Sequence, residues 1–227
     1  MTADEVVARL KSLENPEALV GMARYGIATD KALGVSMPRL RRLAREIGRN
    51  HALAGELWRT GIHDARILAS LVDTPDAVTP QQMEEWVGDF DSWDLCDQCV
   101  MNLFARTTRA ASTAVQWSVR TEEFVKRAGF VIMARLASTN RTENDSVFEL
   151  FLEAIEREST DSRNFVKKSV NWALRGIGAR NVKLHGQSLE VARRLVQSGS
   201  ASARWVGRDA SKELEARAAS GRLRHLG

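Results

Sequence analysis

The sequence is poor in the residues that build disulfide-linked, β-sheet and membrane-spanning proteins. Its 227 residues include 2 cysteines, 4 prolines and 1 tyrosine, and no apolar run approaches the ~20 residues that a membrane helix needs. No alternating run rich in Val, Ile or Thr is bounded by turn residues, so strands are not expected. The start is polar, with Asp4 and Glu5 close to Met1, unlike a secretory or transit signal. We therefore predict a folded, all-helical protein of the cytoplasm that has no membrane partner.

The two cysteines form a CxxC pair, Cys96 and Cys99, which in principle begins a zinc site or a redox pair. A zinc site needs further ligands, and none of the four histidines has metal-like spacing to the pair: His51, His63, His185 and His225. Both cysteines also fall on the apolar side of their helix, which favours inert core thiols. We expect no metal and no cofactor.

Acidic and basic residues are unevenly distributed along the chain. The formal net charge is +4. The residues from Asp161 to the end carry fourteen Lys and Arg against five Asp and Glu, whereas the first 160 residues carry an excess of five acids. A basic final third favours a polyanionic partner, although a basic helical face is more often only solvated.

Apolar periodicity and capping residues predict helices throughout. Proline and glycine mark several of the boundaries, as at Pro16, at Gly34 to Pro38, and at Pro80 after Thr79. The helices expected in the first half cover residues 2–13, 16–25, 37–47, 51–59, 64–72 and 81–87.

Similar short motifs recur along the chain. Phe124, Phe165 and Trp205 each open such a motif and are separated by 41 and 40 residues, while Trp93 and His63 fit the same register at 31 and 30 residues upstream. Spacings of ~30 to 45 residues are typical of solenoids built from helix pairs. Stacked pairs bury a continuous core and leave a concave inner surface. The motifs then mark the inner helices, each preceded by an outer helix.

The segment DFDSWDLCDQC, residues 89 to 99, places an indole and a carboxylate on one helix face. Ser92 is the expected N-cap, and Trp93 and Asp97 are four residues apart, beside the apolar stripe. A half-desolvated carboxylate there can be catalytic, or it can be an ordinary Asp that caps or pairs with a neighbour. The repeat alignment favours the first interpretation, because Arg127, Lys168 and Arg208 occupy the position of Cys96. Asp97 is thus an acidic exception on a basic inner surface.

Two further helices present cations away from their apolar stripes. Trp172 lies roughly 145° from the stripe of its helix, on the face that presents Lys168 and Arg175. Arg127 is about 140° off its own stripe, in a helix for which Thr121 is the expected N-cap. Such faces suit duplex DNA, because Arg and Lys neutralise phosphates and indoles pack on sugars or bases. Packing of Trp172 against the neighbouring repeat is the alternative.

A carboxylate is unfavourable for DNA binding itself and so needs another explanation. Cleavage of an N-glycosidic bond provides one, since positive charge develops on the deoxyribose and a nearby anion stabilises it. A base that is already cationic from alkylation leaves without a general acid. One carboxylate that holds a water and the developing cation would suffice.

The motifs WDLCD at 93–97, FVKRA at 124–128 and NFVKKSVNWALR at 164–175 resemble those of the DNA alkylation-repair glycosylases of the AlkD type. The resemblance extends from the GVSMPRL segment at 34–40 through most of the chain. It implies a curved, right-handed all-α solenoid of about six HEAT-like antiparallel helix pairs with a concave basic face. It further implies removal of cationic N3- or N7-alkylated purines from duplex DNA. Its implied site residues are Asp97 as catalytic carboxylate, Trp93 and Trp172 against the lesion sugar, and Arg127 on the DNA backbone, where we also expect Lys168, Arg175 and Arg208.

Two other functions fit the same residues. A non-catalytic module would bind damaged or branched DNA through shape and charge, and a solenoid scaffold would bind a protein partner. Residue types alone favour the DNA-binding module, whereas the resemblance favours the glycosylase. We expect a monomer with a single domain over residues 1–227, associated with the nucleoid when it is on DNA. Asp94 is expected to act as a cap or salt-bridge partner rather than as a second acid.

Overall fold

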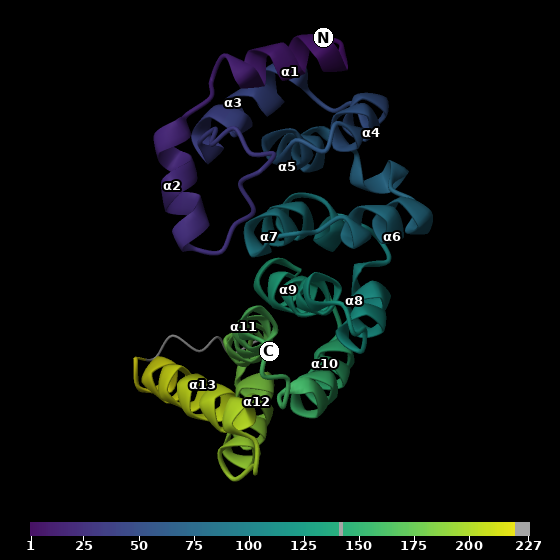
Figure 1. The fold of residues 1–227 in the computed structure, drawn as a ribbon. Coiled ribbons are helices and arrows are strands. Elements are labelled where there is room, and N and C mark those ends of the chain that lie inside the picture. Colours follow the sequence, from purple (N-terminus) through teal and green to yellow (C-terminus); the bar gives the residue numbers. More distant parts are fainter. Residues whose placement is uncertain (141–142, 221–227) are drawn as a thin grey trace. The chain divides into compact units, whose positions relative to one another are not determined.

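The computed structural model describes residues 1–140 and 143–220, and over these residues the chain is helical without a strand (Figure 1). The all-helical prediction is confirmed. Within the same residues, none of the helices combines the length and apolar character needed to cross a bilayer.

The chain forms two compact units, Met1–Thr108 and the residues from Arg109 onward, which we describe separately. The single-domain assignment stays a prediction. The first unit contains α1 (Ala3–Lys11), α2 (Pro16–Arg24), α3 (Met37–Ile47), α4 (His51–Arg59), α5 (His63–Val72), η1 (Pro75–Ala77), α6 (Pro80–Gly88), α7 (Trp93–Asn102) and η2 (Phe104–Arg106). The second contains α8 (Ala110–Ser118), α9 (Glu123–Thr139), α10 (Asp145–Glu158), α11 (Asn164–Gly178), α12 (Val182–Val196) and α13 (Ala201–Ala219).

Local capping sets many of the helix starts that the sequence predicted. Thr2 forms a capping box with Glu5 at α1, and the Thr79 side chain accepts from the Gln82 amide at α6. Pro38 lies in the first turn of α3, where its missing N–H leaves no partner unsatisfied. These caps satisfy amide groups that have no partner within the helix.

The recurrent motifs lie on alternate helices, as the repeat alignment predicted. They open in the first turns of α5, α7, α9 and α11 and one turn later in α13, and each of these helices follows an outer one: α4, α6, α8, α10 or α12. In the first unit α5 packs against α3, α4 and α7, and in the second α11 packs against both α9 and α13. The helix-pair repeat architecture is therefore confirmed within each unit.

Each unit has its own apolar core, to which inner and outer helices both contribute. Large, fully buried side chains of the first unit are Leu10, Leu40, Leu43, Leu57, Leu68, Leu95, Leu103 and Phe104. Those of the second are Trp117, Phe130, Phe148 and Phe151. On the outer side of the first unit, the rings of Trp58 in α4 and Trp86 in α6 stack with centroids 4.0 Å apart.

Glycine permits the closest approach between α8 and α9. A Cβ at Gly129 would lie 2.8 Å from the carbonyl oxygen of Ala114 and 2.8 Å from the amide nitrogen of Ser118, and backbone atoms cannot move aside as a flexible side chain can. Gly129→Ala should therefore lower the free energy of unfolding by about 1–3 kcal/mol, as overpacking does. Urea denaturation measures this change.

Gly186 is the matched control for this substitution. It lies inside α12, and a Cβ there would meet nothing within 4 Å. Gly186→Ala should raise stability by up to about 1 kcal/mol because alanine is the better helix former. Equal stability of the Gly129→Ala variant and the wild-type protein would contradict the close packing described here.

Candidate functional site

Helix α7 carries the indole and the carboxylate that the sequence singled out. It begins at Trp93 with Ser92 as N-cap residue, although the Ser92 side chain makes no capping hydrogen bond and instead donates to Asp91 Oδ1 at 3.0 Å. The prediction that Ser92 is the N-cap residue is confirmed, but its side chain does not form the hydrogen bond expected of a cap. Backbone geometry and the burial of Ser92 define this helix start.

Asp97 is more buried than expected, with 7% of its surface exposed. The helical wheel predicted a half-desolvated position beside the apolar stripe. The aligned residues on neighbouring inner helices explain the difference, because Ile67, Ala128 and Ser169 are all buried. Asp97 thus occupies a packing position of the repeat. A carboxylate at such a position costs free energy unless it is paired or hydrogen-bonded.

The Trp93 indole is fixed by a hydrogen bond within the first unit. Its Nε1 donates to the backbone carbonyl of Tyr25, just after α2, at 2.9 Å. The ring is half-buried. The hydrogen bond ties α2 to the start of α7 and holds the indole in one orientation beside Asp97 on the same helix.

Asp94 pairs with His63, the residue that opens the aligned motif on α5. Asp94 Oδ2 lies 2.9 Å from His63 Nε2, and His63 is 4% exposed. Burial alone would lower the pKa of His63, but the hydrogen bond and charge of Asp94, with the charges of Asp64 and Asp91, raise it above its ordinary value. The predicted role of Asp94 as a salt-bridge partner is confirmed. The pair joins α5 to the helix that carries Asp97.

The raised pKa of His63 predicts a pH-dependent stability. Protonated His63 stabilises the fold fully below its unfolded pKa of about 6.5, and this contribution is lost as pH rises through the higher folded value. In His63→Gln, the deficit in unfolding free energy relative to wild type should be largest near pH 5.5 and shrink towards pH 8.5. Denaturant titration across that range measures it.

Asp94→Asn removes the other member of the pair and should show the same pH trend. At pH 6 we expect a loss on the order of 2 kcal/mol, as for a hydrogen bond to a charged group. Stability curves of wild type and both variants that run parallel from pH 5.5 to 8.5 would contradict the protonated pair.

Arg127, on α9 of the second unit, is buried rather than presented to solvent as the helical wheel predicted. It is 6% exposed, and its Nη1 donates to the backbone carbonyl of Phe165 at 2.7 Å. The guanidinium thus reaches the first turn of α11. The expected cap was also displaced by one residue, since Glu122 and not Thr121 precedes α9.

Helix α11 carries three of the predicted interface residues at positions 168, 172 and 175. Lys168 is exposed and Trp172 is half-buried outside the core of α11. On α13, Arg208 is exposed as well. Within residues 1–140 and 143–220, neither Lys168 nor Arg208 forms an ion pair. These two cations are therefore available to a polyanion.

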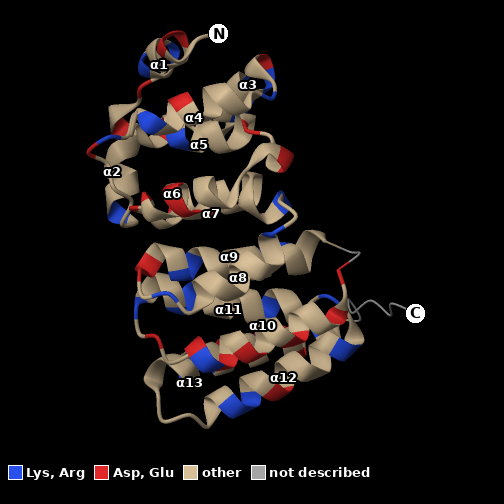
Figure 2. Ribbon diagram, turned by 90° about the vertical axis from the view of Figure 1, so that its right-hand side faces the viewer, with Lys and Arg blue, Asp and Glu red and all other residues tan. Residues whose placement is uncertain are grey.

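Arg175 is engaged with acids of α13, which the sequence comparison missed. Its Nη1 lies 2.6 Å from Glu213 Oε2 and 3.5 Å from Asp209 Oδ2, and Asn171 Nδ2 donates to the same Asp209 oxygen at 2.6 Å. Asp209 occupies the repeat position of Asp97. The basic inner positions therefore include a second carboxylate, but this one forms a structural link between α11 and α13. Basic residues (blue) and acidic residues (red) both occur along the helices of the second unit (Figure 2).

Cys96 and Cys99 are fully buried free thiols, as predicted. Burial, with a smaller contribution from Cys96 and Asp73, raises the pKa of the Cys99 thiol well above its ordinary value, which makes it a poor nucleophile. In the part of the chain that the structure describes, no three His, Cys, Asp or Glu side chains gather as metal ligands. His225 lies outside the described residues.

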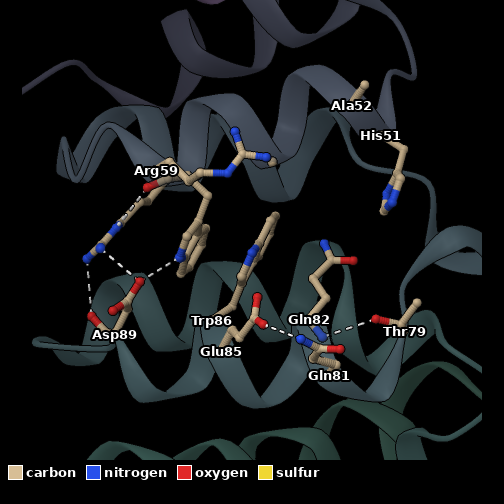
Figure 3. A pocket seen from close by; sticks show the side chains of 12 residues that line it. His51, Ala52, Arg59, Thr79, Gln81, Gln82, Glu85, Trp86 and Asp89 are labelled. Atoms are coloured by element: carbon tan, nitrogen blue, oxygen red, sulfur yellow. Dashed lines mark hydrogen bonds and ion pairs between the residues drawn. The ribbon is translucent and has the colours of Figure 1, made fainter.

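A polar pocket of about 510 Å³ lies between α4 and α6 in the first unit (Figure 3). Several of its side chains are bonded to one another or to the helix frame. Arg66 and Trp58 both donate to Asp89 Oδ2, at 2.9 and 2.8 Å, and Gln81 donates to Glu85. Trp58 and Trp86 stack ring on ring, so each ring covers one face of the other. These bonds explain the pocket as part of the α4–α6 packing.

Comparison with known proteins places this helical-repeat architecture in a family. The sequence model of the family described as "DNA alkylation repair enzyme" matches residues 6–214. The chain belongs to this DNA alkylation repair family.

Several known proteins are similar to this chain over most of its length. Two uncharacterised proteins, of Listeria innocua and Listeria monocytogenes, are 24% and 23% identical, each over 85% of this chain and 86% of the relative. A solved structure with 21% identity superposes with a TM-score of 0.83, covering 98% of this chain and 96% of that one. It is described as a member of "a new family of proteins related to the HEAT-like repeat DNA glycosylases with affinity for branched DNA structures". The similarity supports the HEAT-like repeat fold.

Proposed function

We propose that this protein is a monofunctional DNA glycosylase that hydrolyses the N-glycosidic bond of cationic N3- or N7-alkylated purines in duplex DNA. The observation that carries the proposal is the burial of Asp97. Its carboxylate stands at a position where aligned helices bury Ile67, Ala128 and Ser169. None of these three aligned residues is charged, and a carboxylate fixed at that position suits a site that stabilises a cation.

The proposed chemistry requires one anion. As the bond from C1′ to N9 of the purine lengthens, its electron pair leaves with the base and neutralises the positive charge that alkylation at N3 or N7 gave it. Positive charge moves to the deoxyribose, where the Asp97 carboxylate stabilises it. A water then attacks C1′ and loses a proton, which leaves an abasic site and the free purine. Because the leaving base is already cationic, no general acid is needed.

The remaining residues bind the substrate in this proposal. Trp93 is held by its bond to Tyr25 and presents a fixed ring edge near Asp97 on α7. Lys168 and Arg208 bind phosphates, and Trp172 packs on a sugar. Arg127 and Arg175 hold the second unit together through Phe165, Asp209 and Glu213, so their contribution to DNA binding is smaller than that of the exposed cations.

Removing the charge of Asp97 tests the mechanism. Wild-type protein incubated with methylated duplex DNA should release 3-methyladenine or 7-methylguanine, and Asp97→Asn should slow release on the order of 100-fold while retaining DNA binding. Release is measured by chromatography of the free base under single-turnover conditions. Full activity of Asp97→Asn would sink the assigned role.

Binding of branched DNA without catalysis is the second candidate function. It is favoured by the solved relative that is described as having affinity for branched DNA, and by the bonds that already engage Arg127 and Arg175. It predicts no base release and tighter binding to a four-way junction than to duplex arms of the same sequence. Base release that depends on Asp97, with equal binding of junction and duplex, would eliminate it.

A further inference from the structure

A groove bordered by arginines lies at the C-terminal end of α3, in the first unit. Its cavity of about 360 Å³ is lined by Arg41, Ala44, Arg45, Gly48, Arg49 and Leu71. Helices α3 and α5 pack side by side here (Figure 1), and Leu71 comes from the last turn of α5. Three guanidinium groups thus surround a short apolar floor.

Two of these arginines are available to a ligand. Arg49 is held in place, since its Nη1 donates to the backbone carbonyls of Leu71 and Asp73 at the end of α5. Arg41 and Arg45 are exposed, and neither pairs with a carboxylate among the residues that the structure describes. The one acid of α3, Glu46, is paired with Arg9 at 2.6 Å.

Helix energetics account for only part of this arrangement. Arg45 lies in the last turn of α3, where a cation is favourable near the negative end of the helix dipole. Arg41 lies one turn earlier, and Arg39 and Arg42 add further like charge to a helix with a single acid. An ordinary solvated face intersperses both signs of charge. Here one sign dominates, in a part of the chain that is acidic on average.

We infer that this groove binds the phosphate backbone of duplex DNA, as a second contact region on the first unit. Arg41 and Arg45 are four residues apart on one helix face, about 6 Å along its axis, so their guanidinium forks can each hold a phosphate. Ala44 and Leu71 give an apolar surface for the deoxyribose between them. The inference rests on the DNA binding, but not on the catalysis, of the proposed function.

The salt dependence of DNA binding tests this inference. The probe is an unmodified, fluorescently labelled duplex, and its anisotropy gives the affinity of the full-length protein across a range of salt concentrations. Arg41→Gln with Arg45→Gln should weaken binding at every sequence tested. The slope of log affinity against log salt should fall by roughly two, one for each lost phosphate contact.

The matched control removes two other exposed arginines of the same unit, Arg24 at the end of α2 and Arg59 at the end of α4. Arg24→Gln with Arg59→Gln lowers the net charge equally and should leave the slope unchanged. Equal slopes for the groove variant and wild type, or equal losses in groove and control variants, would overturn the inference. The inference would also be overturned if the groove variant lost binding to anionic lipid vesicles but bound the duplex as well as wild type does, because the groove would then serve a membrane surface.

Failure of the groove and failure of the glycosylase are distinguishable. If methylated DNA releases no base but the groove variant loses slope, the DNA contact stands and the catalytic proposal falls. If base release occurs and the salt slope of the groove variant equals that of wild type, the catalytic proposal stands and the groove contact falls. The catalytic measurement changes Asp97 alone, and the groove measurement uses undamaged DNA.

Discussion

The packing of successive inner helices near their N-terminal ends is the constraint on which the rest of this structure depends. On α5 and α7 the contact is the His63–Asp94 pair, on α9 and α11 it is the Phe124–Phe165 ring contact at 5.7 Å, and on α11 and α13 Lys167 lies over the Trp205 ring. Each contact includes at least one residue that opens the recurrent motif: His63, Phe124, Phe165 or Trp205. The register that these contacts fix also decides which side chain of the following turn is buried.

The same register explains why the side chain of Asp97 is buried. The position that follows each of these contacts is buried on four helices, where it holds a small or apolar residue on α5, α9 and α11 and Asp97 on α7, whereas the aligned Asp209 on α13 is half-exposed. Asp209 is accounted for by Asn171 and Arg175, which make it part of the α11–α13 link. Asp97 sits deeper, on a helix anchored on one side by Asp94 and on another by the Trp93 bond to Tyr25. A carboxylate on a helix anchored in this way is suited to stabilise a cation without rearrangement.

The helices, and the alternation of outer and inner helices, could be predicted because both follow from patterns in the sequence: apolar periodicity, proline at helix starts and motifs at regular intervals. Side-chain orientation could not. A helical wheel treats Arg127 as pointing away from its own core, yet the guanidinium is buried because the carbonyl of Phe165 lies within its reach on the next inner helix. Arg175 was predicted to contact DNA because its partners Asp209 and Glu213 lie 34 and 38 residues later in the chain, on α13, and no pattern within α11 indicates them. The basic character of α3 was not singled out because the first 160 residues, which include α3, carry a net negative charge.

The central claim is that Asp97 stabilises positive charge on the sugar. Its most direct test compares the affinity for duplexes that carry either a cationic pyrrolidine or a neutral tetrahydrofuran in place of one deoxyribose. A transition-state mimic binds a complementary site at least ~100-fold more tightly than a ground-state mimic. We predict that preference for the cationic duplex in the wild-type protein and its loss in Asp97→Asn. Equal affinity of the wild-type protein for both duplexes would contradict the account.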